Sequence, residues 1–535
     1  MKNRYAQTAL LLLIPLYLLA QPKLSTDFTV TTAAPFPVID AGSKEYFSDG
    51  TYVVSVKTRA QKVTIQKFSI DGMKEVTRKE YTEWPPYLKV QSVMKMKGKL
   101  YYIYASYDKK GKFNTIYSRE INTDDLSLGA EIMLFKSEKK IIPSGGTGGV
   151  GFMGMAIGGT MIKVFKSFDE SKILLCYRNA PKERDDRINF DVLGFHVFDA
   201  NLEKQWGGNI KMPYTEKVMN NLAYGIDKDG NAYMLAYITE KKNFELFSIS
   251  ESQELTTHEL DVEGSLFFKK MNLYENADGN LVVAGLYSNG LDFKMSWTGS
   301  STYSYNVNGI VQYTMTKDGN VLSTNDIEFP IELINMYKSA RAKASNERRE
   351  SKGKAGISDL QMREIVTNED GSTIFLAEQH YSKRVYSGKS TKTYYYFADM
   401  VITKIDKDGK VVWQKKVPKS QMGMTGKGGM GVAYVKGKDS HYLLYLDNVK
   451  NADIPLSKVP AQHRDGRGGF LTAYKINDAS GEVEKHTIFD VTNVKDMQAY
   501  QFKTTRIFEV KDNVFMVEVY IKGKQDSMIK MELNQ

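Results

Sequence analysis

Short runs of apolar, β-branched and aromatic residues recur along the whole chain, and a tight polar turn separates each run from the next. Typical runs are residues 52–56 (YVVSV), 100–104 (LYYIY), 282–286 (VVAGL) and 514–519 (VFMVEV). Runs of this length and composition are typical of β-strands. Helical periodicity is nearly absent, so the pattern predicts an all-β protein.

The turns between strong runs fall into two alternating sets. Asp-Gly pairs recur in both sets, and they suit tight hairpins because glycine accepts a positive φ. The first set would join a first strand to a second, and comprises Asp49-Gly50, Lys97-Gly98, Asp169-Glu170, Asp229-Gly230, Asp278-Gly279, Asp370-Gly371, Gly437-Lys438 and Asp512-Asn513. The second set would join a third strand to a fourth, and comprises Asp71-Gly72, Asn122 to Asp125, Ala200-Asn201, Ser250 to Ser252, Asp318-Gly319, Asp408-Gly409 and Asp478 to Gly481.

These sets define seven four-strand units and a last unit, from about Tyr500 to Leu533, that stops after three strands. The missing strand can come from Asp27 to Thr32, which would leave no open sheet edge there. Radial repetition of four-stranded sheets is the propeller architecture. We therefore expect residues 21–535 to form a single β-propeller of about eight four-stranded blades, with an N-terminal strand closing the ring. Seven blades, or a pair of β-sandwich domains, are the alternatives.

Two segments around the second set of turns carry a family resemblance. Phe195 to Ile210 reads FHVFDANLEKQWGGNI and Ile402 to Val417 reads ITKIDKDGKVVWQKKV, and both place an Asp, a turn and then a Trp on the outer strand. They resemble the degenerate repeats of quinoprotein-like propellers, and only Trp206 and Trp413 keep the tryptophan. The resemblance implies blade structure. It implies no quinone, because such dehydrogenases commonly carry a vicinal cysteine pair and this chain has one cysteine; we expect no cofactor.

The N-terminal twenty residues have the layout of a secretory signal peptide. Lys2 and Arg4 precede an apolar stretch from Ala9 to Ala20, which ends in a small residue. This stretch is shorter than the ~20 helical residues that span a bilayer, although an uncleaved anchor is the alternative. We expect residues 1–20 to be removed, the mature protein to be periplasmic or at the cell surface, and no transmembrane segment to remain. The lone Cys176, in an apolar run, is expected to be a buried thiol.

The net charge of +10 and the pI of about 9.0 favour acidic partners. In an exported protein these would be an envelope protein, an anionic glycan or a lipid headgroup surface, and nucleic acid is not expected. Charge that serves only solubility is the other interpretation.

Topology predicts that the long segments share one face. In a blade of four strands, the first–second and third–fourth turns lie on one face, and the remaining connections lie on the other. Long second-to-third connections are residues 178–189, 287–305, 381–393 and 447–468, and long crossings between blades are 136–161, 330–358 and 418–430. The crossing 330–358 is a basic insertion with one expected helix, roughly Ile331 to Ser351. Rigid scaffolds present binding residues on such loops.

Candidate binding residues come from three of these segments. Trp297 and Tyr303 could stack on sugar rings, Tyr381, Arg384 and Lys389 form a basic loop, and a polar cluster comprises His463, Arg464, Asp465 and Arg467. A histidine beside an acid and two arginines could perform acid–base work on an anionic sugar. Surface or packing roles are the simpler interpretations of each group.

Most enzyme signatures are missing from the sequence. It contains no GxSxG elbow and no HExxH motif, and its six histidines lack metal-ligand spacing, so we expect no metal. We expect an exported cell-envelope binding or scaffold protein that holds a protein or glycan partner. The alternative is a carbohydrate-active enzyme, a glycoside hydrolase or lyase acting on an acidic glycan, which would require two carboxylates converging at ~5–10 Å.

Overall fold

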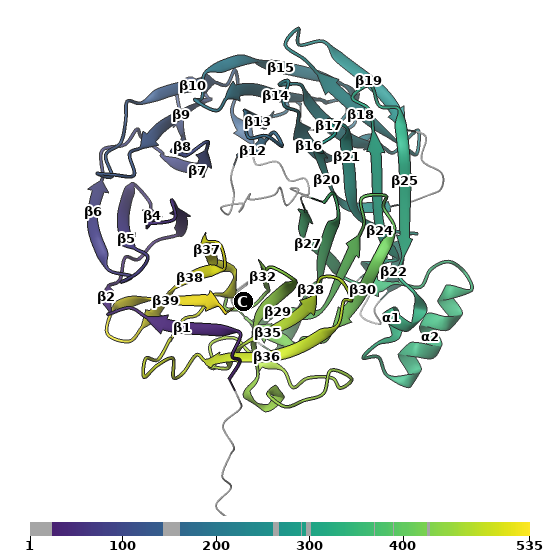
Figure 1. Cartoon of the computed structure of the whole chain (residues 1–535). Coiled ribbons are helices and arrows are strands. Elements are labelled where there is room, and N and C mark those ends of the chain that lie inside the picture. Colours follow the sequence, from purple (N-terminus) through teal and green to yellow (C-terminus); the bar gives the residue numbers. More distant parts are fainter. Residues whose placement is uncertain are drawn as a thin grey trace, which may run out of the picture.

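The computed structural model describes residues 24–534, except 143–160, 184, 261–266, 290, 296–300, 369, 389 and 425–427. The described chain is all-β with two short α-helices, and its sheets are built mainly from antiparallel strands that follow one another along the chain. Eight sheets of four or more strands occur in the described ranges, and we number them sheet 1 to sheet 8 along the chain. They follow one another around a common centre (Figure 1) in a propeller-like fold.

The first four sheets occupy the N-terminal half. Sheet 1 contains β3 (Ser43–Ser48), β4 (Tyr52–Arg59), β5 (Lys62–Ser69) and β6 (Glu75–Tyr81). Sheet 2 contains β7 (Lys89–Met96), β8 (Lys99–Asp108), β9 (Phe113–Ile121) and β10 (Ile132–Lys136). Sheet 3 contains β12 (Ile162–Lys166), β13 (Lys172–Asn179), β14 (Phe190–Asp199) and β15 (Lys204–Thr215), with β11 (Ile141–Ile142) beside β13. Sheet 4 contains β16 (Met219–Ile226), β17 (Ala232–Ile238), β18 (Asn243–Ile249) and β19 (Leu255–Leu260).

The other four sheets occupy the C-terminal half. Sheet 5 contains β20 (Phe267–Glu275), β21 (Leu281–Ser288), β24 (Gly309–Met315) and β25 (Val321–Glu328). Sheet 6 contains β27 (Leu360–Thr367), β28 (Thr373–Ser387), β29 (Ser390–Ile405), β30 (Val411–Val417), β31 (Gln421–Gly423) and β34 (His463–Arg464). Sheet 7 contains β32 (Ala433–Lys436), β33 (Ser440–Asp447), β35 (Phe470–Asn477) and β36 (Val483–Asp490). Sheet 8 contains β37 (Phe508–Lys511), β38 (Val514–Ile521), β39 (Gln525–Leu533), β1 (Phe28–Thr32) and the short β2 (Phe36–Pro37).

Every turn of the two predicted sets lies between the strands that the sequence assigns to it. The Asp-Gly turns are wider than the two-residue loops expected of such pairs. Between β16 and β17, the Gly230 amide donates to the Asp227 carbonyl (3.2 Å) and the Asn231 amide donates to Asp227 Oδ1 (2.8 Å). Gly230 closes this turn at φ +89°, a backbone conformation that glycine adopts without strain.

Apolar packing joins each sheet to the next. Eight clusters of buried side chains lie between successive sheets, and each cluster takes residues from two of them. Sheets 1 and 2 share a cluster that includes Val56 and Tyr102. A further cluster joins sheet 8 to sheet 1 and includes Met516 and Val53. The core is therefore a series of interfaces between sheets.

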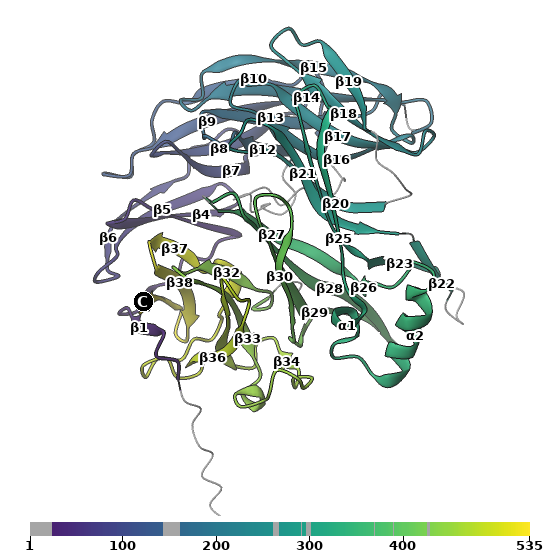
Figure 2. The ribbon, with the colours of Figure 1, turned by 45° about the vertical axis from the view of Figure 1, so that its right-hand side comes forward.

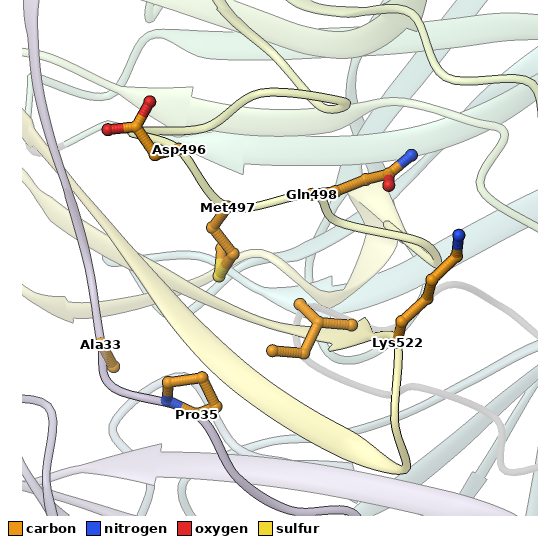
Figure 3. A pocket seen from close by; sticks show the side chains of 7 residues that line it. Ala33, Pro35, Asp496, Met497, Gln498 and Lys522 are labelled. Carbon is orange, nitrogen blue, oxygen red and sulfur yellow. The ribbon is translucent and has the colours of Figure 1, made fainter.

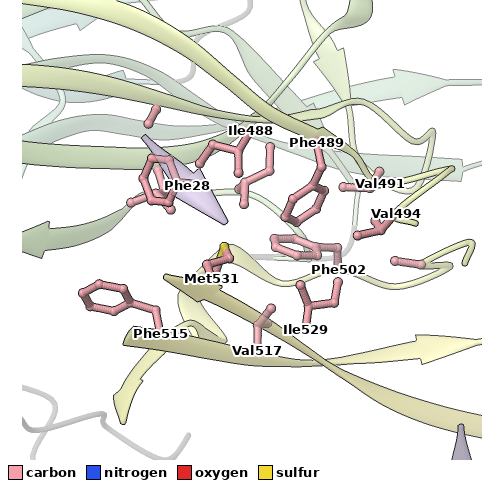
Figure 4. Packing of buried hydrophobic residues seen from close by; sticks show 14 of the residues in the cluster. Phe28, Ile488, Phe489, Val491, Val494, Phe502, Phe515, Val517, Ile529 and Met531 are labelled. Atoms are coloured by element: carbon pink, nitrogen blue, oxygen red, sulfur yellow. The ribbon is translucent and has the colours of Figure 1, made fainter. Parts of the chain in front are cut away.

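The N-terminal strand lies in the sheet formed by the C-terminal end of the chain. β1 pairs antiparallel with β39, from Phe28 opposite Leu533 to Thr32 opposite Ile529, as the sequence predicts for this segment. Phe28 packs among buried residues of sheets 7 and 8 (Figure 4). Its ring meets that of Tyr442 edge-on, with 5.4 Å between the centroids.

A buried ion cluster lies where sheet 8 meets sheet 1. Glu518 of β38 binds Lys57 Nζ and Lys44 Nζ, each at 2.5 Å, and Asp526 of β39 binds Lys44 Nζ at 3.0 Å. The side chains of Lys57 and Glu518 have no exposed surface. Burial alone would raise the pKa of Glu518, but the two lysine charges lower it to about 2. We call these four residues the seam cluster.

Two carboxyl groups at this seam titrate near neutral pH. Burial raises the pKa of Glu45 to about 7, although the Arg506 charge lowers it. Burial and the Glu518 charge raise the pKa of Asp526 to about 6, against the attraction of Lys44. A carboxyl group whose pKa is raised by folding contributes stability that is complete below its unfolded pKa and is lost as the pH rises through the folded pKa. Taken alone, these two groups should therefore raise the urea midpoint when the pH is lowered from about 8 to about 5. The buried histidines act in the opposite sense, since burial lowers the pKa of His196 to about 3 and also lowers that of His463.

At still lower pH Glu518 acts against the gain from the two carboxyl groups, since its pKa is lowered and its contribution is lost as it becomes protonated. The variant Asp526→Asn isolates one of the two groups. Relative to the wild type, its midpoint should fall as the pH is lowered from about 8 to about 5, because only the wild type gains from protonation of Asp526. Equal changes in the two proteins would contradict this assignment.

Both tryptophans of the repeat-like segments join neighbouring sheets. Trp206 of β15 donates to the Gly230 carbonyl in sheet 4 (2.8 Å), and Trp413 of β30 donates to the Asp478 carbonyl in sheet 7 (2.8 Å). Each is thus an outer-strand residue that fixes a turn of the next sheet.

Cys176 of β13 is buried, and burial raises the pKa of its thiol to about 12.

The basic insertion between sheets 5 and 6 contains two helices where the sequence predicts one. α1 (Ile331–Asn335) and α2 (Ala340–Glu350) are separated at Tyr337, which has a φ of +62°, and Ser339 then caps α2. Lys416 of β30 donates to the carbonyls of Leu333, Ile334 and Met336 and so anchors the end of α1. α2 buries no residue and lies outside the ring of sheets (Figures 1 and 2). Neither helix, nor any other among the described residues, is long and apolar enough to cross a membrane.

Candidate functional site

Three of the predicted long segments meet in one sheet. β28 and β29 form a hairpin that continues past β30, which pairs with β29 only over Met400–Ile405. Beyond that point β31, from the crossing after sheet 6, pairs with Tyr395–Phe397 of β29. β34, from the long connection in sheet 7, then pairs in parallel with β31. The connections between second and third strands and the crossings between sheets lie at this end, which we call the long-loop end.

One row of side chains crosses all four strands. Tyr381 lies opposite Tyr396, Tyr396 opposite Met422, and Met422 opposite Arg464. Directly paired residues share a sheet face, and so do residues two apart on one strand. Lys383 and its pair Tyr394 therefore join this face. We call these six residues the platform; neighbouring strands lie about 4.8 Å apart, so it is about 14 Å across.

The platform combines aromatic rings with cations. The rings of Tyr381 and Tyr396 stack at 4.9 Å and 10°, and Lys383 Nζ lies 5.4 and 5.3 Å from their centroids. Burial raises the pKa of Tyr381, which keeps its hydroxyl a hydrogen-bond donor. Met422 and the three tyrosines are half-buried, while Lys383 and Arg464 are exposed. Hydroxyl, ammonium and guanidinium donors together suit an anionic group.

The opposite face of the same strands is buried. His380 stacks on Phe397 at 4.2 Å, and the next residues in this row are Gln421 and His463. His463 is 2% exposed, its Nε2 has no hydrogen-bond partner among the described residues, and burial lowers its pKa against the pull of Asp447. It is therefore a neutral, inward-facing ring.

Buried charges hold this face in place. Glu378 binds Arg363 at 2.7 Å and also binds Lys419, and the side chains of Glu378 and Lys419 have no exposed surface. Burial would raise the pKa of Glu378, but the charges of Lys419 and Arg363 lower it. Lys419 Nζ also donates to Gln421 Oε1 (3.0 Å), and Gln421 Nε2 donates to the Leu446 carbonyl (2.8 Å). The network links β31 to β28 in sheet 6 and to β33 in sheet 7.

The structure places the candidate residues of the basic hairpin and of the polar cluster on different faces of this sheet. Tyr381 and Arg464 share the platform, whereas His463 is on the buried face because successive residues of a strand point to opposite faces. Arg384 is exposed on the hairpin face opposite Tyr381. Asp465 accepts a hydrogen bond from the Gly429 amide (2.7 Å) and so holds the glycine-rich crossing.

The remaining candidates lie elsewhere. Arg467 is exposed in the turn after β34. Tyr303 belongs to β23 (Ser301–Val307), in a separate small sheet with β22 (Leu291–Met295) and β26 (Ile357–Ser358), and its backbone pairs with Phe293. Trp297 and Lys389 fall outside the described residues, as do residues 1–20.

The sequence analysis did not single out Tyr394, Tyr396 and Met422, and it treated Lys383 only as one cation of the basic loop 381–393. A signal for three of them was present, since a hairpin centred near Gly388 places Tyr381 and Lys383 opposite Tyr396 and Tyr394. Met422 carried no such signal, because a three-residue strand in a crossing has no readable periodicity.

Carboxylates come close together around lysines in the described chain. Glu518 and Asp526 both bind Lys44 Nζ, and their side chains are 0% and 1% exposed. Asp227, Asp229 and Glu275 all bind Lys317 Nζ among the short turns, where the Asp229 side chain is 59% exposed. The described residues contain no group of three or more His, Cys, Asp or Glu side chains placed to hold a metal ion. A hollow beside β2 brings together Asp496, Gln498 and Lys522 over an apolar wall (Figure 3), and it offers a single carboxylate.

No protein-family model matches the chain, and no curated protein matches it. Among solved structures, it is similar to a prolyl endopeptidase (TM-score 0.39, 9% identity), with 92% of this chain covered and 55% of that one. It is also similar to the β-propeller domain of the Trilobed protease from Pyrococcus furiosus (TM-score 0.33, 10% identity, 86% of this chain and 98% of that one). A protein of unknown function from Bacteroides caccae gives a TM-score of 0.27 at 12% identity, with coverages of 66% and 89%. Similarities at this level concern the fold alone, and the propeller-like architecture rests on the sheets and their packing.

Proposed function

We propose that this protein is an exported cell-envelope binding or scaffold protein, periplasmic or at the cell surface, that holds an acidic protein or an anionic glycan on its long-loop face. The observation that carries the proposal is the platform. Segments more than 80 residues apart in sequence, at Tyr381 and Arg464, join in one sheet and present tyrosines and cations on one exposed face. A rigid sheet holds such donors in a fixed pattern at little cost in conformational entropy.

The proposal includes a finer description of the scaffold. The eight sheets are eight blades of one ring, closed by the N-terminal strand in sheet 8, and residues 1–20 are a signal peptide. Two observations support the ring: apolar clusters join every pair of successive sheets, and one of them joins the last sheet to the first. The pairing of β1 with β39 brings the two ends of the described chain together. The basic n-region before a short apolar stretch supports export.

Co-purification from native membranes tests the binding role. The mature chain should retain an acidic protein or an anionic glycan that can be identified by mass spectrometry. Charge reversal at the platform, Lys383→Glu with Arg464→Glu, should lower the affinity for that molecule at least about tenfold, because both changes place like charges against it. Both side chains are exposed, so the urea midpoint should stay unchanged.

Lys74→Glu with Lys228→Glu is the matched control, since both lysines are exposed in short turns at the opposite end of the sheets. This variant should bind as the wild type does. A partner held equally well by both double variants would exclude the platform as the binding site. If the purified chain depolymerised an acidic glycan, the protein would be an enzyme, and the proposal that it only binds its partner would be wrong.

A further inference from the structure

Exposed apolar side chains occur at both ends of the sheets in the described chain. At the long-loop end they are Tyr87, Ile188, Met336, Met424, Val449, Val459 and Tyr500 on connections, with Val385 and Tyr386 near the end of β28. At the opposite end they are Phe168 in a short turn and, in the first two residues of fourth strands, Val76, Ile132, Met133, Leu322, Val411 and Val412. Isolated exposed apolar residues are ordinary on a protein surface, whereas those that gather with cations at the end of a projecting loop mark an interaction surface.

The hairpin of β28 and β29 carries the most exposed of these residues. β31 pairs no further along β29 than Tyr395, so the ribbon beyond this point, up to Ser387 opposite Ser390, projects without further strands. At about 3.4 Å per residue this projection is about 15–20 Å long. Val385 is 47% exposed and Tyr386 75% exposed near its end, and Met424 of the adjoining crossing is 58% exposed.

Cations surround these apolar residues on both faces of the ribbon. Val385 shares one face with Lys383 and with its paired residue Lys392, and Tyr386 shares the other face with Arg384. The sequence from 381 to 393 contains no Asp or Glu. A partner that docks flat against one face would need apolar and basic residues on that face only. Here both faces of the ribbon carry apolar and basic residues, as expected if the end of the ribbon is surrounded by its partner.

The neighbouring loop repeats the same pairing. Val449 and Val459 of the β33–β35 connection are 51% and 65% exposed, and Lys450 and Lys458 are their immediate neighbours in sequence. This loop continues into β34, which joins the same sheet as the hairpin. Exposed apolar residues at loop ends, each beside a cation, therefore occur in two loops held by one sheet.

From these observations we infer that the hairpin end, residues 384–388 and 390–392, is a contact site for an anionic lipid surface. Apolar side chains insert at the boundary between the headgroups and the acyl chains, and tyrosine is enriched at this interface. Lysines and arginines pair with the lipid phosphates. A lipid surface is fluid and needs no shape complementarity, which fits a narrow ribbon with no groove. The inference goes beyond the proposed function: the platform at the base of the hairpin would be held close to a membrane.

Co-sedimentation of the mature protein with lipid vesicles tests this site. The wild type should bind phosphatidylcholine vesicles that contain phosphatidylglycerol, and bind phosphatidylcholine alone much more weakly. Val385→Ser with Tyr386→Ser should weaken binding at least about tenfold, because two side chains lose their transfer into the apolar layer. Arg384→Ser with Lys392→Ser should weaken binding more than about tenfold at low salt, because each cation contributes near an anionic surface.

A second measurement reports insertion directly. Cys176 is buried, so Tyr386→Cys creates a single accessible thiol for an environment-sensitive fluorophore. The emission should shift to the blue on addition of the phosphatidylglycerol vesicles. The same label at Phe168→Cys, an equally apolar exposed position in a short turn, should not respond, and Phe168→Ser should sediment as the wild type does.

Failure of the wild type to bind these vesicles, or equal binding by the Val385 and Tyr386 double variant, would overturn the lipid site. Binding of polygalacturonate through Arg384 and Lys392 without any binding to vesicles would overturn it as well, and would make the hairpin end a site for acidic glycans. The platform variants Lys383→Glu and Arg464→Glu test the proposed function through co-purified partners. The two ideas can therefore fail separately.

Discussion

Glu518→Gln should lower the free energy of unfolding by about 3–5 kcal/mol, the usual consequence of removing one partner from a buried ion pair. The substitution keeps the side-chain shape but leaves Lys57 as a buried ammonium ion without its counterion. Lys44 keeps Asp526 at 3.0 Å, so the loss centres on Lys57. Urea unfolding followed by tryptophan fluorescence gives the magnitude.

The location of the seam cluster makes a second readout available. Because it lies between sheet 8 and sheet 1, its loss should open the end-to-end sheet first, and hydrogen exchange of Phe28–Thr32 and β39 should accelerate more than that of sheet 4. Lys57→Met combined with Glu518→Leu should recover most of the stability, since an apolar pair can replace a buried ion pair.

Glu80→Gln is the control for the seam cluster, because Glu80 pairs with Lys62 at 2.8 Å with both side chains about half exposed. Pairs of this kind contribute about 0–1 kcal/mol. A Glu518→Gln protein as stable as Glu80→Gln would show that the buried pair does not hold the seam.

The second large effect concerns Glu378→Gln, for which we expect a loss of about 3–5 kcal/mol in unfolding free energy. Glu378 is buried between Arg363 and Lys419, and the substitution removes the carboxylate charge that neutralises these two cations. Since Gln421 begins β31, the loss should also loosen the strand that carries Met422 to the platform. Urea unfolding measures the first effect, and hydrogen exchange over Gln421–Gly423 measures the second.

Glu482→Gln is a suitable control, as Glu482 is exposed in the β35–β36 turn, and its stability should lie within about 0.5 kcal/mol of the wild type. A protein that is globally destabilised by Glu378→Gln but keeps normal exchange in β31 would mean that the charge network supports sheet 6 without positioning the platform. Unchanged stability would contradict the role of Glu378 altogether.

The boundaries of the strands were predictable because they depend on local properties. The strand and turn signals act within a few residues: they are runs of β-branched residues and glycines at positive φ, such as Gly230. The turns therefore lie where the sequence pattern predicts them. The partner of the N-terminal strand was also predictable, from the one unit that had three strands. The helix of the basic insertion was only partly predictable, because the break at Tyr337 is stabilised by Lys416 on another strand.

The candidate site was predictable only in part. The basic hairpin and the cluster near Arg464 stand out as charged, aromatic segments in long connections, and both contribute to the platform. The buried position of His463 was not predictable, since strand alternation has no meaning until β34 has a partner. Lys419 and Glu378 were likewise overlooked, because a single charged residue beside an apolar run is indistinguishable from a solvent-facing one.

The sequence by itself determined the all-β class, the strands, the turns and the end of the sheets at which the long connections lie, because backbone preferences and side-chain alternation are local. The tertiary structure decided which long connections meet. The row from Tyr381 to Arg464 exists because β31 and β34 complete the hydrogen bonds that β29 leaves open beyond β30. That pairing depends on how sheets 6 and 7 pack and on buried charges that neutralise one another across them, and no local pattern encodes either.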